Sequence, residues 1–99
     1  MTIETKDKIT TKPFDIAEHL TTPEIMAGYL TECLEEDDLN VFLGALDDAC
    51  RAKGMTDVAR LTGLGRESLY KTLSEGTEPR FSTIKKIIAA LDLKITVSV

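Results

Sequence analysis

Apolar residues recur every three or four positions through most of this chain, which is the spacing of amphipathic helices. The first such stretch follows a helix-start signal, because Thr22 can cap a helix and Pro23 fits its first turn. We therefore predict a helix over residues 23–36. Its apolar face is expected to contain Ile25, Met26, Tyr29, Leu30, Cys33 and Leu34.

Four further helices follow from the same pattern. The second begins after Asp37 or Asp38, either of which can cap it, and stops at Gly54, because glycine suits the left-handed end of a helix. Two short helices are predicted at about 56–62, capped by Thr56, and 66–73, and a last one at about 83–91, capped by Ser82. The stripe of the second helix consists of Leu39, Phe42, Leu43, Leu46, Ala49 and Cys50.

The last residues, LKITVSV, change period. Leu93, Ile95 and Val97 alternate with polar residues, which predicts a half-buried strand over 93–98. A lone strand leaves backbone groups unsatisfied, so it needs a partner: the N-terminal arm, another protein or a second copy of the chain. The expected fold is therefore mostly α. An arm at 1–13 precedes a single domain at 14–99, in which the helix at 23–36 is followed by a repressor-like core at 38–91 and the strand.

The stretch VARLTGLGRESLYKTL fits a helix-turn-helix. Such a unit needs a small residue where its helices cross, a left-handed residue in the turn and a buried anchor in the second helix. Ala59, Gly63 and Leu69 supply these in order. The alternative is an ordinary corner in a helical bundle, but such a corner has no need of the basic side chains on the outer face of its second helix.

In a helix-turn-helix the second helix enters the major groove of DNA, with its N-terminal residues near base edges. Arg66 can bind guanine with two hydrogen bonds, and Glu67 can accept one from cytosine. The residues predicted to contact DNA are Thr56, Arg66, Glu67, Ser68, Tyr70, Lys71 and Arg80.

Charge is divided unevenly along the chain, whose net charge is −5. Residues 1–54 hold five Lys or Arg and twelve Asp or Glu, whereas residues 55–99 hold seven and five. This asymmetry indicates two different partners, although an ordinary solvated acidic face also accounts for it. A monomer with so few basic residues would bind DNA weakly, so we expect a homodimer, paired through the C-terminal strand.

Catalytic and metal-binding patterns are not evident. Cys33 and Cys50 fall on apolar stripes, which is typical of buried reduced thiols, and the single histidine, His19, stands apart from them. No apolar run is long enough to span a membrane, and the N-terminus lacks the apolar region of a secretory signal. The sequence predicts a cytoplasmic protein that is not an enzyme and that needs no metal or cofactor.

Three segments resemble the addiction-module antidote proteins, which are HigA-like antitoxins with a lambda-repressor-like helix-turn-helix. They are FDIAEHLTTPEIMAGYLTECLEE, LGALDDACRAKGMTDVARLTGLGRESLYKTLS and PRFSTIKKIIAALDLKITV, and the likeness covers about residues 14–97. Gly65 departs from the family pattern, in which serine is expected. A helix that starts at glycine lacks a capping side chain.

The resemblance implies the antitoxin of a type II toxin–antitoxin system. Such a protein neutralises a small basic toxin of the RelE/ParE type (HigB-like) and represses its own operon. The residues expected to face the toxin are acidic: Glu32, Glu35, Glu36, Asp37 and Asp38. Two alternatives stay open, namely a stand-alone phage-type repressor without a toxin and a protein-binding module whose helix-turn-helix is vestigial.

Overall fold

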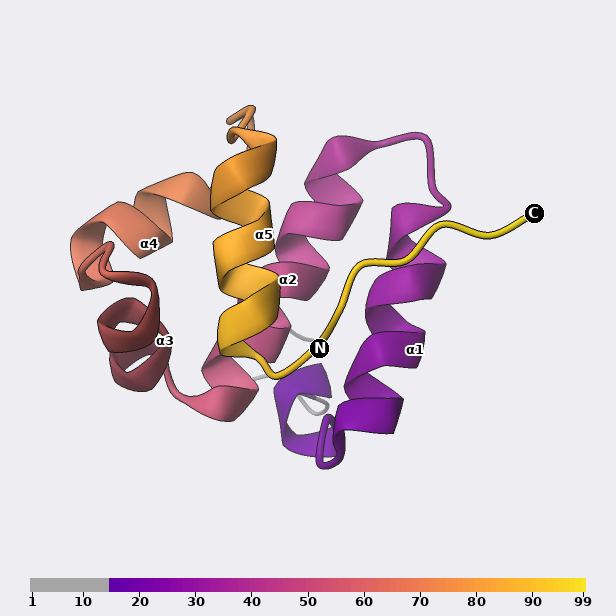
Figure 1. Ribbon diagram of the computed structural model, residues 1–99, viewed down its shortest axis with the longest axis horizontal. Helices are drawn as coiled ribbons and strands as arrows, with labels where there is room; N and C mark the ends of the chain where they lie inside the picture. The colour runs from indigo at the N-terminus through magenta and orange to yellow at the C-terminus, as the bar shows by residue number, and fades with distance from the viewer. Residues whose placement is uncertain (1–14) are drawn as a thin grey trace, which may run out of the picture.

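The computed structural model describes residues 15–99, which form a helical molecule (Figure 1). The predicted arm at 1–13 lies outside the described residues. No helix in the described part is long and apolar enough to cross a membrane. The elements are a short 3-10 helix, η1 (Ile16–His19), and five α-helices: α1 (Pro23–Leu34), α2 (Leu39–Lys53), α3 (Met55–Thr62), α4 (Arg66–Thr72) and α5 (Phe81–Ala90).

Helix α2 links the two sides of the molecule. It packs against η1 and α1 on one side and against α3 on the other, and α3 in turn packs against α4 and α5. In Figure 1 α1 lies to the right, the short helices α3 and α4 lie to the left, and α2 and α5 run through the middle, with α5 in front. The charge division in the sequence is therefore also a division in space.

Buried side chains from all five α-helices form one hydrophobic cluster. Helix α2 supplies Ala45, Leu46, Ala49 and Cys50, all at most 1% exposed, and its partners insert larger side chains around them. Those partners include Met26 and Leu30 from α1, Met55 and Val58 from α3, Leu69 from α4, and Ile87 and Ile88 from α5.

The helix starts follow the expected chemistry at α1 and α2 only. The backbone N–H of Ile25 donates to Thr22 Oγ1 at 3.1 Å, and that of Asn40 donates to Asp38 Oδ1 at 2.9 Å. The predicted cap at Thr56 is wrong: Gly54, with φ of +114°, lets α3 begin directly at Met55. The last helix also starts earlier than predicted, at Phe81 after Arg80, so Ser82 lies within its first turn.

The predicted C-terminal strand is wrong. Residues 93–99 have no regular secondary structure. No strand is present anywhere in residues 15–99, so this segment has no strand to pair with in the described part of the chain. Leu93 instead closes α5, because its N–H donates to Ile88 O at 3.1 Å while the N–H of Asp92 donates to Ala89 O at 3.0 Å. Asp92 has φ of +62°, so this is the Schellman helix end. The first residue of the alternating pattern thus belongs to a helix cap, and the expected pairing of two copies through this strand is withdrawn.

Candidate nucleic-acid and partner interfaces

A tight corner joins α3 to α4. Gly63 ends α3 with φ of +75°, and its N–H donates to Ala59 O at 3.0 Å. Ala59 is buried beneath the corner, and Leu69 is fully buried in the core. The small residue, the left-handed residue and the buried leucine named from the sequence therefore lie at or beside this corner, and Leu69 holds one face of α4 against the body.

Gly65 gives α4 its direction. It is the residue before the helix and has φ of +78°, in the region that side-chain-bearing residues rarely adopt. A serine here would supply a cap but would have to occupy a strained backbone conformation. The departure from the family pattern therefore fits the local geometry of this turn.

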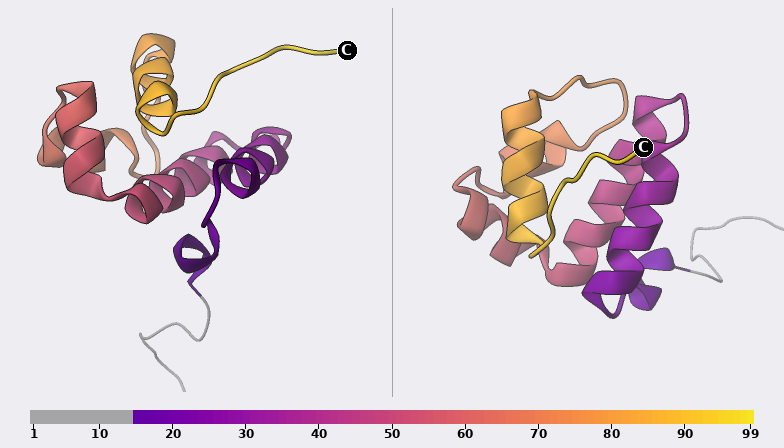
Figure 2. Two further views of the ribbon diagram at one scale, coloured as in Figure 1. Left: turned by 60° about the horizontal axis from the view of Figure 1, so that its bottom comes forward. Right: turned by 45° about the vertical axis from the view of Figure 1, so that its right-hand side comes forward.

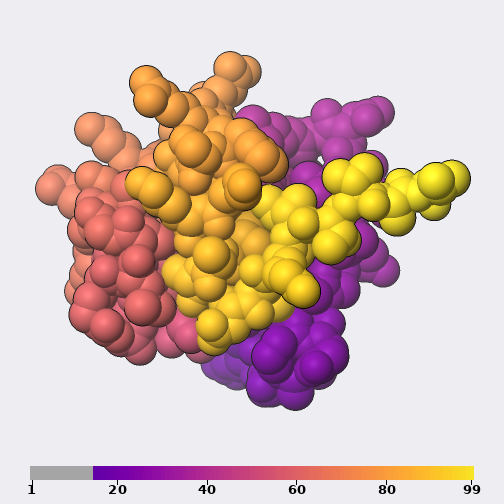
Figure 3. All heavy atoms as spheres, viewed as in Figure 1, coloured from indigo at the N-terminus to yellow at the C-terminus, as the bar shows by residue number. Residues whose placement is uncertain are grey.

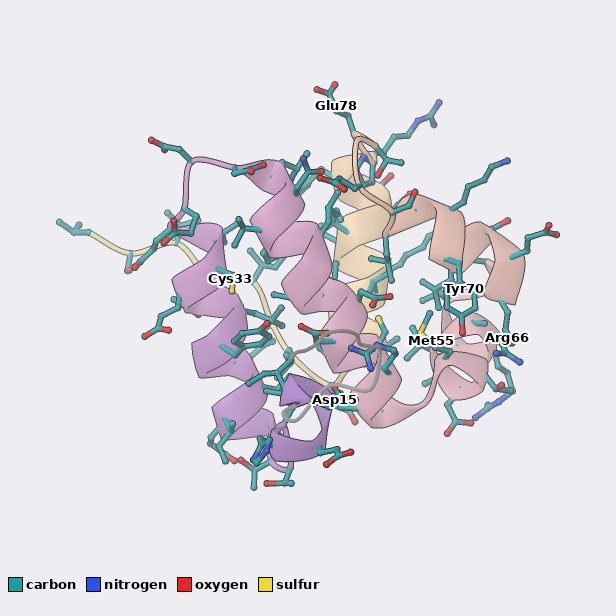
Figure 4. The ribbon with its side chains drawn as sticks, turned by 180° about the vertical axis from the view of Figure 1, so that it is seen from behind. Asp15, Cys33, Met55, Arg66, Tyr70 and Glu78 are labelled. Atoms are coloured by element: carbon teal, nitrogen blue, oxygen red, sulfur yellow. The ribbon has the colours of Figure 1, made fainter. Side chains whose placement is uncertain are left out.

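Five side chains of α4 face outward. Arg66, Glu67, Ser68, Tyr70 and Lys71 are all exposed. The guanidinium of Arg66 lies against the next turn of the helix, because Nη2 donates to Tyr70 Oη at 3.2 Å and Cζ is 5.8 Å from the Tyr70 ring centre. Figure 4 shows these two side chains together at the outer edge of the molecule. The arrangement offers hydrogen-bond donors on a convex, solvent-facing helix.

A shallow groove brings the C-terminal part of α4 to the start of α5. It is lined by Ser68, Lys71, Thr72, Thr77, Glu78, Pro79, Arg80 and Thr83. Lys71 and Arg80, which are separate in the sequence, therefore lie on one surface with Ser68. Thr56 is exposed on the first turn of α3 and does not line this groove. Glu78, at the top of Figure 4, is an acidic group at the rim of an otherwise polar and basic surface.

The acidic residues gather at the opposite side. Residues 15–50 contain ten Asp or Glu and no Lys or Arg. Glu32, Glu35, Glu36, Asp37 and Asp38 are all exposed, at the end of α1 and in the turn to α2. Among the described residues, this turn has no ion pair with a basic side chain.

A second acidic cluster is partly neutralised. On α2, Arg51 Nη1 lies 3.5 Å from Asp15 Oδ2, and Arg51 Nε lies 3.3 Å from Asp47 Oδ2. The Nη2 group of the same arginine donates to Asp48 Oδ1. The Tyr29 hydroxyl donates to Asp48 Oδ2 at 2.8 Å, and its burial, together with that carboxylate, raises the pKa of the phenol. This network ties η1 and α1 to α2. Within residues 15–99, the carboxylates of the α1–α2 turn take no part in this network.

Three apolar side chains expected on buried faces are at the surface: Ile25, Leu34 and Leu39 are 49%, 59% and 45% exposed. Phe81, for which the sequence made no prediction, is 65% exposed. Helical spacing shows that these residues share a face with the core. It does not show that they lie at helix ends, beyond the reach of a covering helix.

The sulfur and metal chemistry of the described residues is simple. Cys33 and Cys50 are free thiols, and no three His, Cys, Asp or Glu side chains of residues 15–99 are grouped so that they could hold a metal ion. Burial raises the pKa of Cys50 to about 12, with a smaller contribution from Asp47.

Known proteins provide a separate line of evidence. Residues 10–99 match the family described as "Probable addiction module antidote protein". An uncharacterized protein from Haemophilus influenzae (strain ATCC 51907 / DSM 11121 / KW20 / Rd) is 46% identical over 86 residues, which cover 87% of this chain and 89% of that protein. No solved structure matches the chain significantly. Because the match spans nearly the whole chain, the protein belongs to the addiction-module antidote family.

Proposed function

We propose that this protein is the antitoxin of a type II system, that it binds its toxin directly, and that it represses its own operon through α4. Family membership supports the antitoxin role and disfavours a stand-alone repressor. The observation that carries the DNA-binding part is the exposed face of α4, held outward by the Gly63 corner and the Leu69 anchor.

The chemistry of α4 suits a major groove. Its first turn presents Arg66 and Glu67, which can read guanine and cytosine respectively. Lys71 and Arg80 lie on one groove surface, where they can neutralise phosphates. Seven basic residues in the second half of the chain are few for tight binding by one copy. We therefore propose that two copies bind half-sites one helical turn apart, by a contact other than strand pairing.

The toxin is proposed to be small and basic, of the RelE/ParE type that the family resemblance implies. The acidic side chains of the α1–α2 turn support a positively charged toxin, because they attract a basic partner during association. The antitoxin is proposed to act by binding and not by catalysis, so the amount of free toxin depends on the stability of the complex.

Titration of the protein against its own upstream DNA tests the DNA-binding part. The double variant Arg66→Ala, Lys71→Ala is expected to lose about tenfold to a hundredfold in affinity, because it lacks one base-edge donor and one phosphate contact. The matched control is Lys94→Ala, which removes an exposed charge from the C-terminal tail, residues 93–99. Fluorescence anisotropy at fixed salt gives the affinities and the number of copies bound.

Two results would contradict this part. One is wild-type protein with equal affinity for upstream and scrambled DNA. The other is an equal loss in the α4 variant and in the Lys94 control, since that would reflect only net charge. If specific DNA binding is absent while a complex with the neighbouring gene product forms, the protein is a toxin-binding module with a vestigial corner.

A further inference from the structure

An apolar groove lies between α1, α2, α5 and the C-terminal tail. Its volume is about 440 Å³, and its walls include Leu30 and Leu34 from α1, Phe42 from α2, Ile84 from α5 and Ile95 from the tail. Figure 2 shows the tail running between α5 and α1, and Figure 3 shows it lying over the surface that joins them.

Large apolar side chains stand at the mouth of this groove. Leu34, Leu39 and Phe81 all line it, although each is about half exposed or more. Ile95 is 42% exposed beside them. Apolar groups gathered in this way favour a partner that removes them from water.

The acidic turn adjoins the groove without lining it. Leu34 and Leu39 lie on either side of Glu35–Asp38, so the apolar side chains and the unpaired carboxylates share one edge. Two basic groups also lie at the groove: Lys94 lines it, and Lys85 Nζ lies 6.0 Å from the Phe81 ring centre. A basic segment in the groove is therefore best placed with its charges toward the α1–α2 turn.

The charges also bear on which partner fits. A second copy has the same net charge of −5 and the same stretch without Lys or Arg at 15–50, so two such faces repel each other on approach. A basic partner has the opposite long-range interaction. Charge complementarity therefore favours a different protein over a second copy of this chain.

We infer that this groove is the toxin-docking surface, and that its occupant is a basic amphipathic segment of the toxin. The apolar side chains of that segment enter between Leu34 and Phe81, and its Lys or Arg residues face the acidic turn. This inference rests on the proposed function, because it assumes that the protein binds a toxin. The inference goes further than the acidic turn, because it also assigns an apolar contact area to the toxin.

The test measures binding of the purified toxin, encoded next to the antitoxin gene, by surface-immobilised antitoxin. The double variant Leu34→Ser, Phe81→Ser is expected to weaken the complex at least thirtyfold, mainly through faster dissociation. Leu61→Ser is the matched control, because Leu61 is a 53% exposed leucine on α3 outside the groove. It is expected to bind within threefold of wild type. Thermal unfolding by circular dichroism checks that each variant is folded.

A second pair of variants tests the charged edge without altering apolar groups. Glu35→Lys with Asp37→Lys is expected to slow association about tenfold, whereas Glu67→Lys, on α4, leaves the rate within threefold. If the double lysine variant folds poorly, the double serine variant still tests whether the toxin binds in the groove. If both pairs bind toxin like wild type, the groove assignment is overturned.

The remaining outcomes separate the two proposals. Wild-type antitoxin that fails to bind the toxin overturns the proposed function and the groove assignment together. Normal toxin binding by the serine double variant, with loss of a wild-type dimer in sedimentation, assigns the groove to a second copy and overturns only the inference. In a third outcome, the serine double variant binds toxin normally and deletion of residues 1–14 changes hydrogen exchange in the groove. The groove then belongs to the chain's own N-terminal segment, and again only the inference is overturned.

Discussion

Burial sets the chemistry of individual residues in this protein. Cys50 is fully buried against the core of α2, and the loss of solvation raises its pKa to about 12. Cys33 is half-buried, and its pKa is raised by burial and by the nearby Glu32 and Glu36 carboxylates. Both thiols are therefore poor nucleophiles at neutral pH, because the reactive form is the thiolate.

Cys50 is expected to resist a thiol reagent such as DTNB at pH 8 in the native protein. A raised pKa disfavours the thiolate, so the native rate stays low until the pH approaches 12 or the protein unfolds. The variant Cys33→Ser isolates Cys50 for the measurement. Equal reaction rates in buffer and in denaturant would contradict the burial that the structure shows.

The sequence predicts residues on the outer face of α4 better than it predicts the groove. Arg66 and Tyr70 are exposed because the buried Leu69 fixes which face of a short helix turns inward. Leu34 looks like a core residue in the sequence and Phe81 carries no prediction, because helical spacing does not show where a neighbouring helix ends. Leu34 is the last residue of α1 and Phe81 is the first residue of α5, so each lies at a helix end and stays exposed.

At the level of elements, helical spacing predicts five α-helices and their order correctly. It fails where a backbone conformation or a tertiary partner decides the outcome. Gly54 starts α3 without the expected threonine cap, and the C-terminal alternation forms no strand because Leu93 completes the end of α5. A period-2 pattern indicates a strand only when another strand is available to pair with it.

Glycines inside two helices limit their stability. Gly28 in α1 and Gly44 in α2 are exposed, and a Cβ atom at either position would meet nothing within 4 Å. Each substitution Gly28→Ala or Gly44→Ala is expected to raise the free energy of unfolding by about 0.5–1 kcal/mol, because alanine loses less backbone entropy in a helix. Urea unfolding measures the change.

Gly63→Ala provides the contrast. A Cβ atom at position 63 also meets nothing within 4 Å, but φ is +75°. The substitution is therefore expected to lower the free energy of unfolding by about 1–2 kcal/mol. Stabilisation by all three alanines would show that the corner relaxes to an ordinary conformation. The comparison separates backbone conformation from packing, since none of the three positions is crowded.

For the molecule as a whole, opposite charges lie on opposite sides of α2. The basic face of α4 and the acidic turn between α1 and α2 belong to different halves, so the two proposed partners need not compete for one surface. Their electrostatics also respond independently, because exposed charges farther apart than about 10 Å are screened at 0.1 M salt.

Toxin association is expected to slow as salt rises. The rate constant for association is expected to fall about tenfold or more between 0.05 and 0.5 M NaCl, because screening removes long-range attraction to the acidic turn, while dissociation changes little. Stopped-flow mixing measures both rates. An association rate that is insensitive to salt would show that charge plays no part in the encounter.

The position of α2 has a consequence for how such a protein can change over generations. Its buried residues contribute to one core that both halves share, so neither the α1–α2 pair nor the α3–α5 group has a separate interior. Recombination at Gly54 would join two fragments whose core residues had not varied together. We therefore expect the partner-binding and DNA-binding specificities to be inherited as a unit and to diverge through surface substitutions, and not through exchange of segments.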